Sequence, residues 1–217
     1  MSCATCGKPD SVCVCDRVAP RAIATAVVVL QHPQEQDVVL GTAPLLERGI
    51  GAIRRVGLSW PNLAAAIGRE PAERWAVIWP SQLPRPLTEA ERTAPFARLS
   101  PRTDVGEDLG PTGLLVLDGT WSQAKALWWR NPWLLKLDRI VLRPREPSIY
   151  GRLRKEPRRE FVSTLEAVAD ALVGLGEDEE VRTELRRAMR TLVQRARDAG
   201  VTAGNGDPDD RAGTTGA

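Results

Sequence analysis

The residues with the clearest chemical potential are Asp118 and the Gly119-Thr120-Trp121 sequence that follows it. They come after an apolar, strand-like run at 113–117 and before a helix-like run at 122–129. In open α/β sheets ligands bind outside the carboxyl ends of the strands, so a carboxylate here could take a proton from a substrate. Thr120 and Gln123 also match a capping box, which would stabilise the helix without any ligand. The segment alone leaves a catalytic corner and a helix cap open.

Four cysteines near the amino terminus follow the pattern C-x2-C-x6-C-x-C, at Cys3, Cys6, Cys13 and Cys15. No cysteine follows residue 15, so disulfides would staple only a short terminal segment. Four thiolates at this spacing suit a tetrahedral zinc ion, and a closed thiolate shell is typical of a structural metal. We therefore predict a zinc site, with an iron–sulfur cluster or free thiols as the alternatives.

Basic residues concentrate between residues 125 and 159, although the whole chain has a net charge of only +2. This stretch holds eleven Lys or Arg residues against three acids. Such a cluster attracts nucleic acid, and a solvated charged face is the alternative. Four tryptophans lie in the same region and could either stack on bases or pack a core, namely Trp121, Trp128, Trp129 and Trp133.

The elements that would position these residues alternate between strand-like and helix-like runs. Apolar runs predict strands at 24–30, 53–58, 75–79, 113–117 and 139–142. Amphipathic spacing and capping residues predict helices at 38–47, 62–67, 122–129, 163–175 and 177–199. Residues 80–112 are expected to be mainly loop. The alternation predicts an α/β domain with a largely parallel sheet.

Three parts are expected along the chain: a four-cysteine zinc segment at 1–20, a catalytic domain at 21–199 and a disordered tail at 200–217.

The chain lacks a phosphate-binding P-loop, a dinucleotide-binding glycine motif and a nucleophile elbow. Their absence argues against a P-loop NTPase, a Rossmann dehydrogenase and a serine hydrolase of the elbow type. His32 is the only histidine, so Ser–His or Cys–His catalysis would rest on one residue. The absence of a long apolar stretch and of a signal peptide predicts a soluble, cytoplasmic protein with no membrane contact.

Several further motifs accompany the cysteines. They are His32-Pro33-x-Glu35 with Thr42, Trp79-Pro80-Ser81, Leu117 to Trp121 with Ala124-Lys125, Ser148-x-Tyr150, and Ser163-Thr164-x-Glu166-Ala167. Taken together, these motifs resemble the DTW-domain family, tRNA-uridine aminocarboxypropyltransferases. Two departures stand out. Ser122-Gln123 replaces residues often found after the family's tryptophan, and Arg152 and Arg154 are rival counterparts of an arginine that the family places after the tyrosine.

The resemblance implies a SPOUT-like α/β fold with a carboxy-terminal trefoil knot, an exception to the rule against threaded chains. It also implies that the protein is an enzyme with S-adenosylmethionine as the donor. The family transfers the 3-amino-3-carboxypropyl group of this donor to N3 of a uridine in tRNA and releases methylthioadenosine.

The resemblance further implies a role for each matching residue. The catalytic residues would be Asp118, as the base, with Thr120 and Trp121. The donor would be bound by Pro80, Ser81, Leu117, Asp118, Gly119, Ser163, Thr164 and Glu166. The zinc segment and the basic run would hold the tRNA through Lys125, Arg143, Arg145, Tyr150, Arg152 and Arg154, of which Arg143 and Arg145 come from the basic run and not from a matching motif.

Two other functions fit the same residues. A SPOUT-type RNA methyltransferase would use the same donor but a different carbon. A non-catalytic, zinc-containing RNA-binding protein would use Asp118 only as a helix cap. Either a monomer or a dimer is compatible with the sequence, as is any uridine position, and Asp118 could either take the proton or only hold the uridine.

Overall fold

The computed structural model describes residues 1–79, 86, 88–89, 94, 96–100, 110–144, 146–151, 153 and 162–201. The strands are β1 (Ala26–Gln31), β2 (Ile53–Val56), β3 (Trp75–Ile78), β4 (Phe96–Leu99), β5 (Gly113–Asp118) and β6 (Asp138–Leu142). The α-helices are α1 (Ala43–Ile50), α2 (Leu63–Ile67), α4 (Trp121–Arg130), α5 (Thr164–Gly174) and α6 (Glu179–Asp198). Short 3-10 helices cover Cys15–Arg17, Pro33–Glu35 and Pro132–Lys136.

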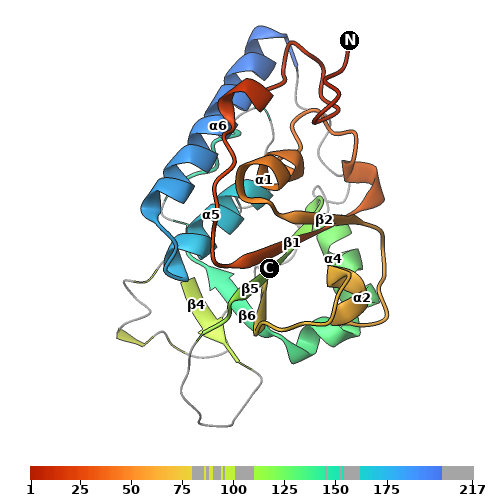
Figure 1. Ribbon diagram of the computed structural model, residues 1–217, viewed down its shortest axis with the longest axis vertical. Coiled ribbons are helices and arrows are strands. Elements are labelled where there is room, and N and C mark those ends of the chain that lie inside the picture. Colours follow the sequence, from red (N-terminus) through yellow and green to blue (C-terminus); the bar gives the residue numbers. More distant parts are fainter. Residues whose placement is uncertain are drawn as a thin grey trace, which may run out of the picture.

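The strands form one sheet in the order β2-β1-β5-β3-β6-β4 (Figure 1). Every pairing is parallel except that of β4 with β6. The predicted α/β class and largely parallel sheet are therefore confirmed. The antiparallel edge strand β4 falls inside the stretch at 80–112 that was expected to be mainly loop, so that expectation was wrong for 96–99. Nearly all of the expected disordered tail lies outside the described residues.

Helices cover both faces of the sheet, which explains why its central strands are continuously apolar. The core under α1, α5 and α6 takes Val27 and Val29 from β1. The core under α2 and α4 takes Val28 and Leu30 from the same strand. Successive side chains of a strand point to opposite faces, so one apolar run supplies both cores. None of the helices in the described ranges is long and apolar enough to cross a membrane.

Side-chain caps set where the helices near the sheet edge begin. Both predicted capping boxes are present, Thr120 with Gln123 at α4 and Ser163 with Glu166 at α5. The helix predicted at 38–47 is instead α1, which begins after Thr42 and has a proline in its first turn. Proline is tolerated there but breaks a helix interior, so Pro44 fixes the start later than the apolar spacing suggested.

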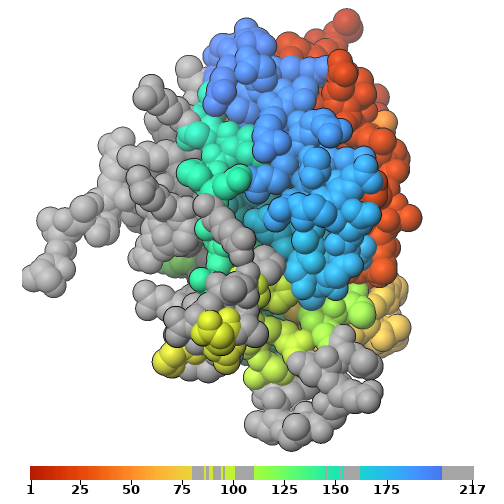
Figure 2. Space-filling view, turned by 90° about the vertical axis from the view of Figure 1, so that its left-hand side faces the viewer, coloured from red at the N-terminus to blue at the C-terminus, as the bar shows by residue number. Residues whose placement is uncertain are grey.

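The amino-terminal cysteine segment packs against the domain rather than hanging from it. Val12, Val14 and Val18 are buried in the same core as α1 and α6. Arg195 of α6 binds the carboxylate of Asp16 through two contacts of 2.9 Å and also donates to the carbonyl of Cys13. The space-filling view shows α6 and this segment side by side over one face (Figure 2). The segment and α6 therefore hold each other in place.

Candidate functional site

The carboxyl ends of β1 and β5 form the part of the sheet where a ligand site is expected. The two strands are neighbours, and their last residues, Gln31 and Asp118, are register partners. The helices that follow them lie on opposite faces, α1 with α5 and α6 on one and α4 on the other. Adjacent strands whose connections leave in opposite directions open a crevice at their carboxyl ends. Asp118 therefore stands at a topological switch point.

The Asp118 carboxylate is 6% exposed and both of its oxygens accept hydrogen bonds. Oδ2 accepts from the side-chain amide of Gln31 at 2.7 Å. Oδ1 accepts from the hydroxyl of Thr164 at 2.5 Å. A buried carboxylate is stable only when such donors replace water. The two donors come from β1 and from the start of α5, so three segments distant in sequence fix this one group.

Gln31 is a site residue that the sequence analysis missed. Its amide is oriented on the far side by Arg54, which donates to Oε1 at 3.0 Å, while Arg54 also donates to Glu47 at 2.8 Å. Because Arg54 occupies the oxygen, the amide nitrogen must face Asp118. The sequence contains only one local indication of this role, a polar residue at the end of an otherwise apolar strand. The indication becomes informative once Gln31 is known to be the register partner of Asp118.

We expect Gln31→Glu to destabilise the protein at neutral pH, because a second carboxylate would face Asp118 in a buried place. Two such carboxylates bind a shared proton more tightly than either does alone, so the folded variant keeps a proton that the unfolded chain releases. Stability is then retained at low pH and lost as the pH rises. Urea denaturation should show a deficit of about 1–3 kcal/mol at pH 7.5 that shrinks toward pH 5.

The matched control is Gln36→Glu, which makes the same charge change at an exposed position near the end of β1. It should unfold like the wild type at both pH values. An equal deficit for Gln31→Glu at both pH values would mean that Gln31 acts through packing rather than through its bond to Asp118.

The start of α5 lies next to Asp118, but most of its polar groups are bonded within the protein. The backbone amide of Leu165 donates to the Thr42 hydroxyl at 3.3 Å, and that of Glu166 donates to the Ser163 hydroxyl at 3.1 Å. Thr164 is half-buried and is the residue of this predicted group that reaches Asp118. Thr164 therefore contacts Asp118, whereas Ser163 caps the start of α5.

Glu166 and Tyr150 are buried at 0% and 2% exposure and bond to the protein interior. The Glu166 carboxylate accepts from the Ser148 hydroxyl at 2.8 Å and from the backbone amide of Ile149 at 3.0 Å. The Tyr150 hydroxyl donates to the carbonyl of Leu40 at 2.6 Å. These contacts join the segment after β6 to α5 and to the loop before α1, so both residues have a structural role beside the candidate site.

Aromatic rings gather at the same edge of the sheet. The ring of Trp79, just after β3, stacks on Trp121 with centroids 5.6 Å apart and on Trp128 with centroids 4.4 Å apart. The Nζ of Lys125 lies 5.0 Å from the centre of the Trp121 ring. Flat rings beside a charged group suit an aromatic ligand.

Some of the remaining predicted site residues lie within the described residues, and the others lie outside them. Leu117 is a buried residue of β5, and Arg143 is half-buried just after β6. A Cβ on Gly119 would lie 2.8 Å from the Cβ of Gln123, so this position needs glycine for the close approach of the capping box. Pro80, Ser81, Arg145, Arg152 and Arg154 lie outside the described residues.

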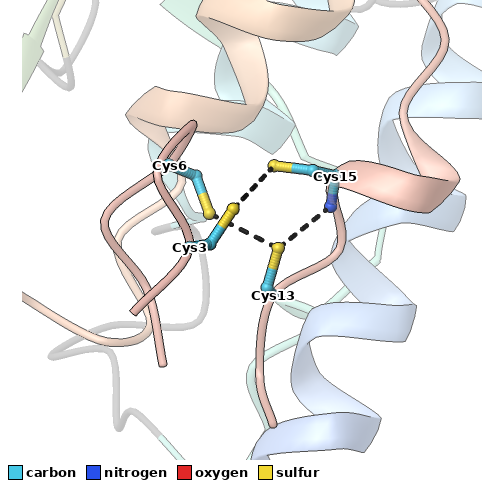
Figure 3. Close-up of side chains that lie close together, drawn as sticks. All are labelled: Cys3, Cys6, Cys13 and Cys15. Carbon is cyan, nitrogen blue, oxygen red and sulfur yellow. Dashed lines mark hydrogen bonds between the residues drawn. The ribbon is translucent and has the colours of Figure 1, made fainter. Parts of the chain in front are cut away.

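The four cysteines converge on one point, with all four sulfur atoms within 4.8 Å of one another (Figure 3). The Sγ atoms of Cys3 and Cys15 are 3.9 Å apart, and those of Cys6 and Cys13 are 3.7 Å apart. A tetrahedral ion with metal–sulfur bonds of about 2.3 Å has sulfur–sulfur edges of about 3.8 Å. Hydrogen bonds from the backbone amides of Cys6 and Thr5 lower the pKa of Cys3 to about 6, whereas burial raises the pKa values of Cys13 and Cys15, so the fit to a metal rests on the sulfur geometry. The geometry and the donor set therefore fit a single metal ion.

Lys8 links this cluster to the rest of the site. It is 4% exposed, and its ammonium donates to the carbonyls of Val39 at 2.7 Å and Gly41 at 2.6 Å. Burial lowers the pKa of Lys8 to about 8. The carbonyls belong to the loop that leads to Thr42, whose hydroxyl accepts from the backbone amide of Leu165 in the first turn of α5. Through Lys8, the cysteine segment thus contacts the loop before α1.

Comparison with known proteins agrees with these observations. A model of the DTW domain matches residues 1–197. The chain is 31% identical over 207 residues to tRNA-uridine aminocarboxypropyltransferase 2 of Drosophila melanogaster, covering 92% of this chain and 76% of that protein. It is 29% identical over 199 residues to the protein of the same name from Mus musculus, covering 88% of this chain and 61% of that protein.

A plant relative is similar over a comparable range. The chain is 27% identical over 218 residues to tRNA-uridine aminocarboxypropyltransferase A of Arabidopsis thaliana, covering 88% of this chain and 79% of that protein. The chain spans about three-fifths of the length of the mouse and macaque relatives. No solved structure matches it. The match of the domain model to nearly the whole chain confirms the resemblance found in the motifs, and the chain belongs to the DTW-domain family.

Proposed function

We propose that this protein is a tRNA-modifying transferase that moves the 3-amino-3-carboxypropyl group of S-adenosylmethionine to N3 of a uridine. The names of its relatives support the reaction. The single observation that carries the proposal is the buried Asp118 carboxylate, held by Gln31 and Thr164 at the switch point of the sheet. A helix cap needs no such pair of donors from distant segments.

The proposed reaction requires a base and an in-line geometry. Uridine N3 loses its proton to the base and attacks the methylene carbon next to sulfur in the aminocarboxypropyl chain. The carbon–sulfur bond breaks, its electron pair stays on sulfur, and methylthioadenosine leaves. Each carbon attached to the sulfonium is electrophilic, so the carbon placed in line with N3 determines the product.

We assign the base to Asp118, with Thr164 and Gln31 as the groups that orient it. Trp121, in its stack with Trp79, would hold one aromatic ring, either the adenine of the donor or the target uracil. Thr120 would fix the corner through its cap of α4. Ser163 and Glu166 would shape the donor pocket by fixing α5, and Leu117, Gly119, Pro80 and Ser81 would complete its lining.

Basic residues after β6 and on α4 would bind the tRNA. Lys125 and Arg143 lie at the same edge of the sheet as Asp118, and we assign phosphate contacts to them and to Arg145, Arg152 and Arg154. Tyr150 would support this segment through its bond to Leu40. The zinc ion, bound by Cys3, Cys6, Cys13 and Cys15, would hold the amino-terminal segment in its fold. A reducing cytoplasm would keep these thiols available.

We also propose that the fold is SPOUT-like with a carboxy-terminal trefoil knot. The order of β5, β6 and α5 and the packing of α5 against the central strands are compatible with this arrangement. The segment at 154–161, which would decide the threading, lies outside the described residues.

The test of the function is analysis of both products. Incubated with tRNA and S-adenosylmethionine, the protein should release methylthioadenosine, and mass spectrometry of the digested tRNA should show an acid-bearing uridine. Release of S-adenosylhomocysteine would identify a methyltransferase instead. If a calorimetric titration shows no binding of the donor, the protein is instead a non-catalytic RNA-binding protein.

We further expect tRNA binding to weaken steeply as salt rises. Each phosphate that a Lys or Arg neutralises contributes a slope of roughly −0.7 to −0.9 to the plot of log affinity against log salt. With several such contacts, the affinity should fall by about tenfold or more between 50 and 200 mM salt. Filter binding at four salt concentrations measures the slope, and a flat line would exclude the basic residues as the main contact.

A further inference from the structure

Helix α4 carries a stripe of side chains that leads away from Asp118. Trp121, Lys125 and Trp129 are spaced four residues apart, so they lie along one face of the helix. The Lys125 ammonium already lies near the Trp121 ring, as the spacing requires. Trp129 stands about 12 Å farther along the helix axis than Trp121, at 1.5 Å for each residue. The stripe therefore runs from the candidate site to the outer end of α4.

Trp129 does not contribute to the core. It is 77% exposed, whereas its neighbour Trp128 is 7% exposed and stacks on Trp79. Trp133, in the next turn, donates from its indole nitrogen to the carbonyl of Trp60 at 2.8 Å. Exposing so large an apolar ring to water is unfavourable, and such exposure is typical of a binding surface when other features support it.

The charge around the stripe indicates which partner it fits. Residues 119–137 contain Lys125, Arg130 and Lys136 and no acidic residue. Asp138, which follows, is buried and paired with Arg74 at 2.9 Å. An exposed indole in a segment that carries cations and no acids is typical of proteins that bind single-stranded nucleic acid, because rings stack on bases while cations contact phosphates.

We propose that Trp129 stacks on an unpaired base of the RNA substrate near the target uridine, with Lys125 contacting the intervening backbone. This inference rests on the proposed function and adds a residue that selects for RNA with an unpaired base beside the modified position. The chemistry takes place at Asp118, and Trp129 acts only in docking.

Trp129→Ala should raise the KM for tRNA by about tenfold, because the variant loses one base stack. The kcat and the KM for S-adenosylmethionine should stay unchanged. Trp129→Phe should restore most of the affinity, since a smaller ring still stacks. Ile53→Ala removes another exposed apolar side chain, 42% exposed on the edge strand β2, and should leave every constant unchanged.

Salt dependence separates the two side chains of the stripe. Trp129→Ala should weaken tRNA binding and keep the salt slope, whereas Lys125→Ala should reduce the slope by about 1. An unchanged KM and affinity for Trp129→Ala would overturn the proposal. A change from dimer to monomer in Trp129→Ala, seen by light scattering, would do the same, because the ring would then face a second copy of the chain.

Product formation by the wild type and tRNA affinity of the Trp129 variants test the reaction and the docking role separately. If the wild type forms the product and Trp129→Ala binds tRNA as tightly as the wild type, the docking role of Trp129 is excluded and the proposed reaction stands. If the wild type forms no product, the function falls, and the affinity of the two Trp129 variants for tRNA still decides whether the stripe binds RNA.

Discussion

Asp118→Asn is expected to lower kcat by about 10²–10⁴, the range over which a positioned base contributes to catalysis. The loss should come from the proton transfer alone. Without the base, hydroxide in the solvent must remove the N3 proton, so the residual rate should rise with hydroxide concentration. Release of methylthioadenosine, measured from pH 6 to pH 9 with tRNA in excess, checks both the size of the loss and its pH dependence.

The structure explains why this variant should still fold. The Asn oxygen can accept from Gln31, whose orientation Arg54 fixes, and the Asn nitrogen can donate to the Thr164 hydroxyl. Each hydrogen bond of the buried group thus has a replacement. Thermal melting and donor affinity should therefore match the wild type.

The control variant is Asp178→Asn, which removes the charge of an exposed acid that caps the start of α6. It should leave kcat unchanged. If Asp118→Asn raised the KM for tRNA and kept kcat, Asp118 would hold the uridine and another group would take the proton.

Removal of the metal should produce the second large effect, a loss of stability. Structural zinc sites contribute about 10–16 kcal/mol in isolated finger peptides, and the segment here also carries three buried valines and the partner of Arg195. We expect Cys13→Ser to lower the free energy of unfolding by at least about 3 kcal/mol, or about 6–12 °C in melting temperature. Metal analysis should give one zinc per chain for the wild type.

Ser11→Ala is the matched control, an exposed residue in the same segment. It should keep both the zinc and the melting temperature. A strong chelator should reproduce the effect of Cys13→Ser on the wild type and have no effect on the variant. Stoichiometric iron, or a wild type that melts at the same temperature after chelation, would contradict a stabilising zinc ion.

Local features of the site could be predicted from the sequence because neighbours in the chain create them. The two capping boxes, at Thr120 and Ser163, depend on residues three apart. The cysteine cluster spans thirteen residues, so its convergence needs only a short folded loop. These parts were found without knowledge of the strand order.

The contacts of Asp118 could not be predicted because they depend on topology. Gln31 is 87 residues away and Thr164 is 46 residues away. Their approach follows from the parallel register of β1 with β5 and from the return of α5 to the same edge. Neither property appears in local spacing. The strand β4 was missed for the same reason, since it is defined by its pairing with β6.

The contacts between α6 and the cysteine segment also have a consequence for biosynthesis. Arg195 and Asp16 are 179 residues apart, and Arg21 and Glu184 are 163 apart. On the ribosome, the cysteine segment emerges before α6 and cannot form these contacts until that helix has left the exit tunnel. Packing of the cysteine segment against α6 is therefore a late step of folding, and Val12, Val14 and Val18 stay incompletely buried until that helix is available.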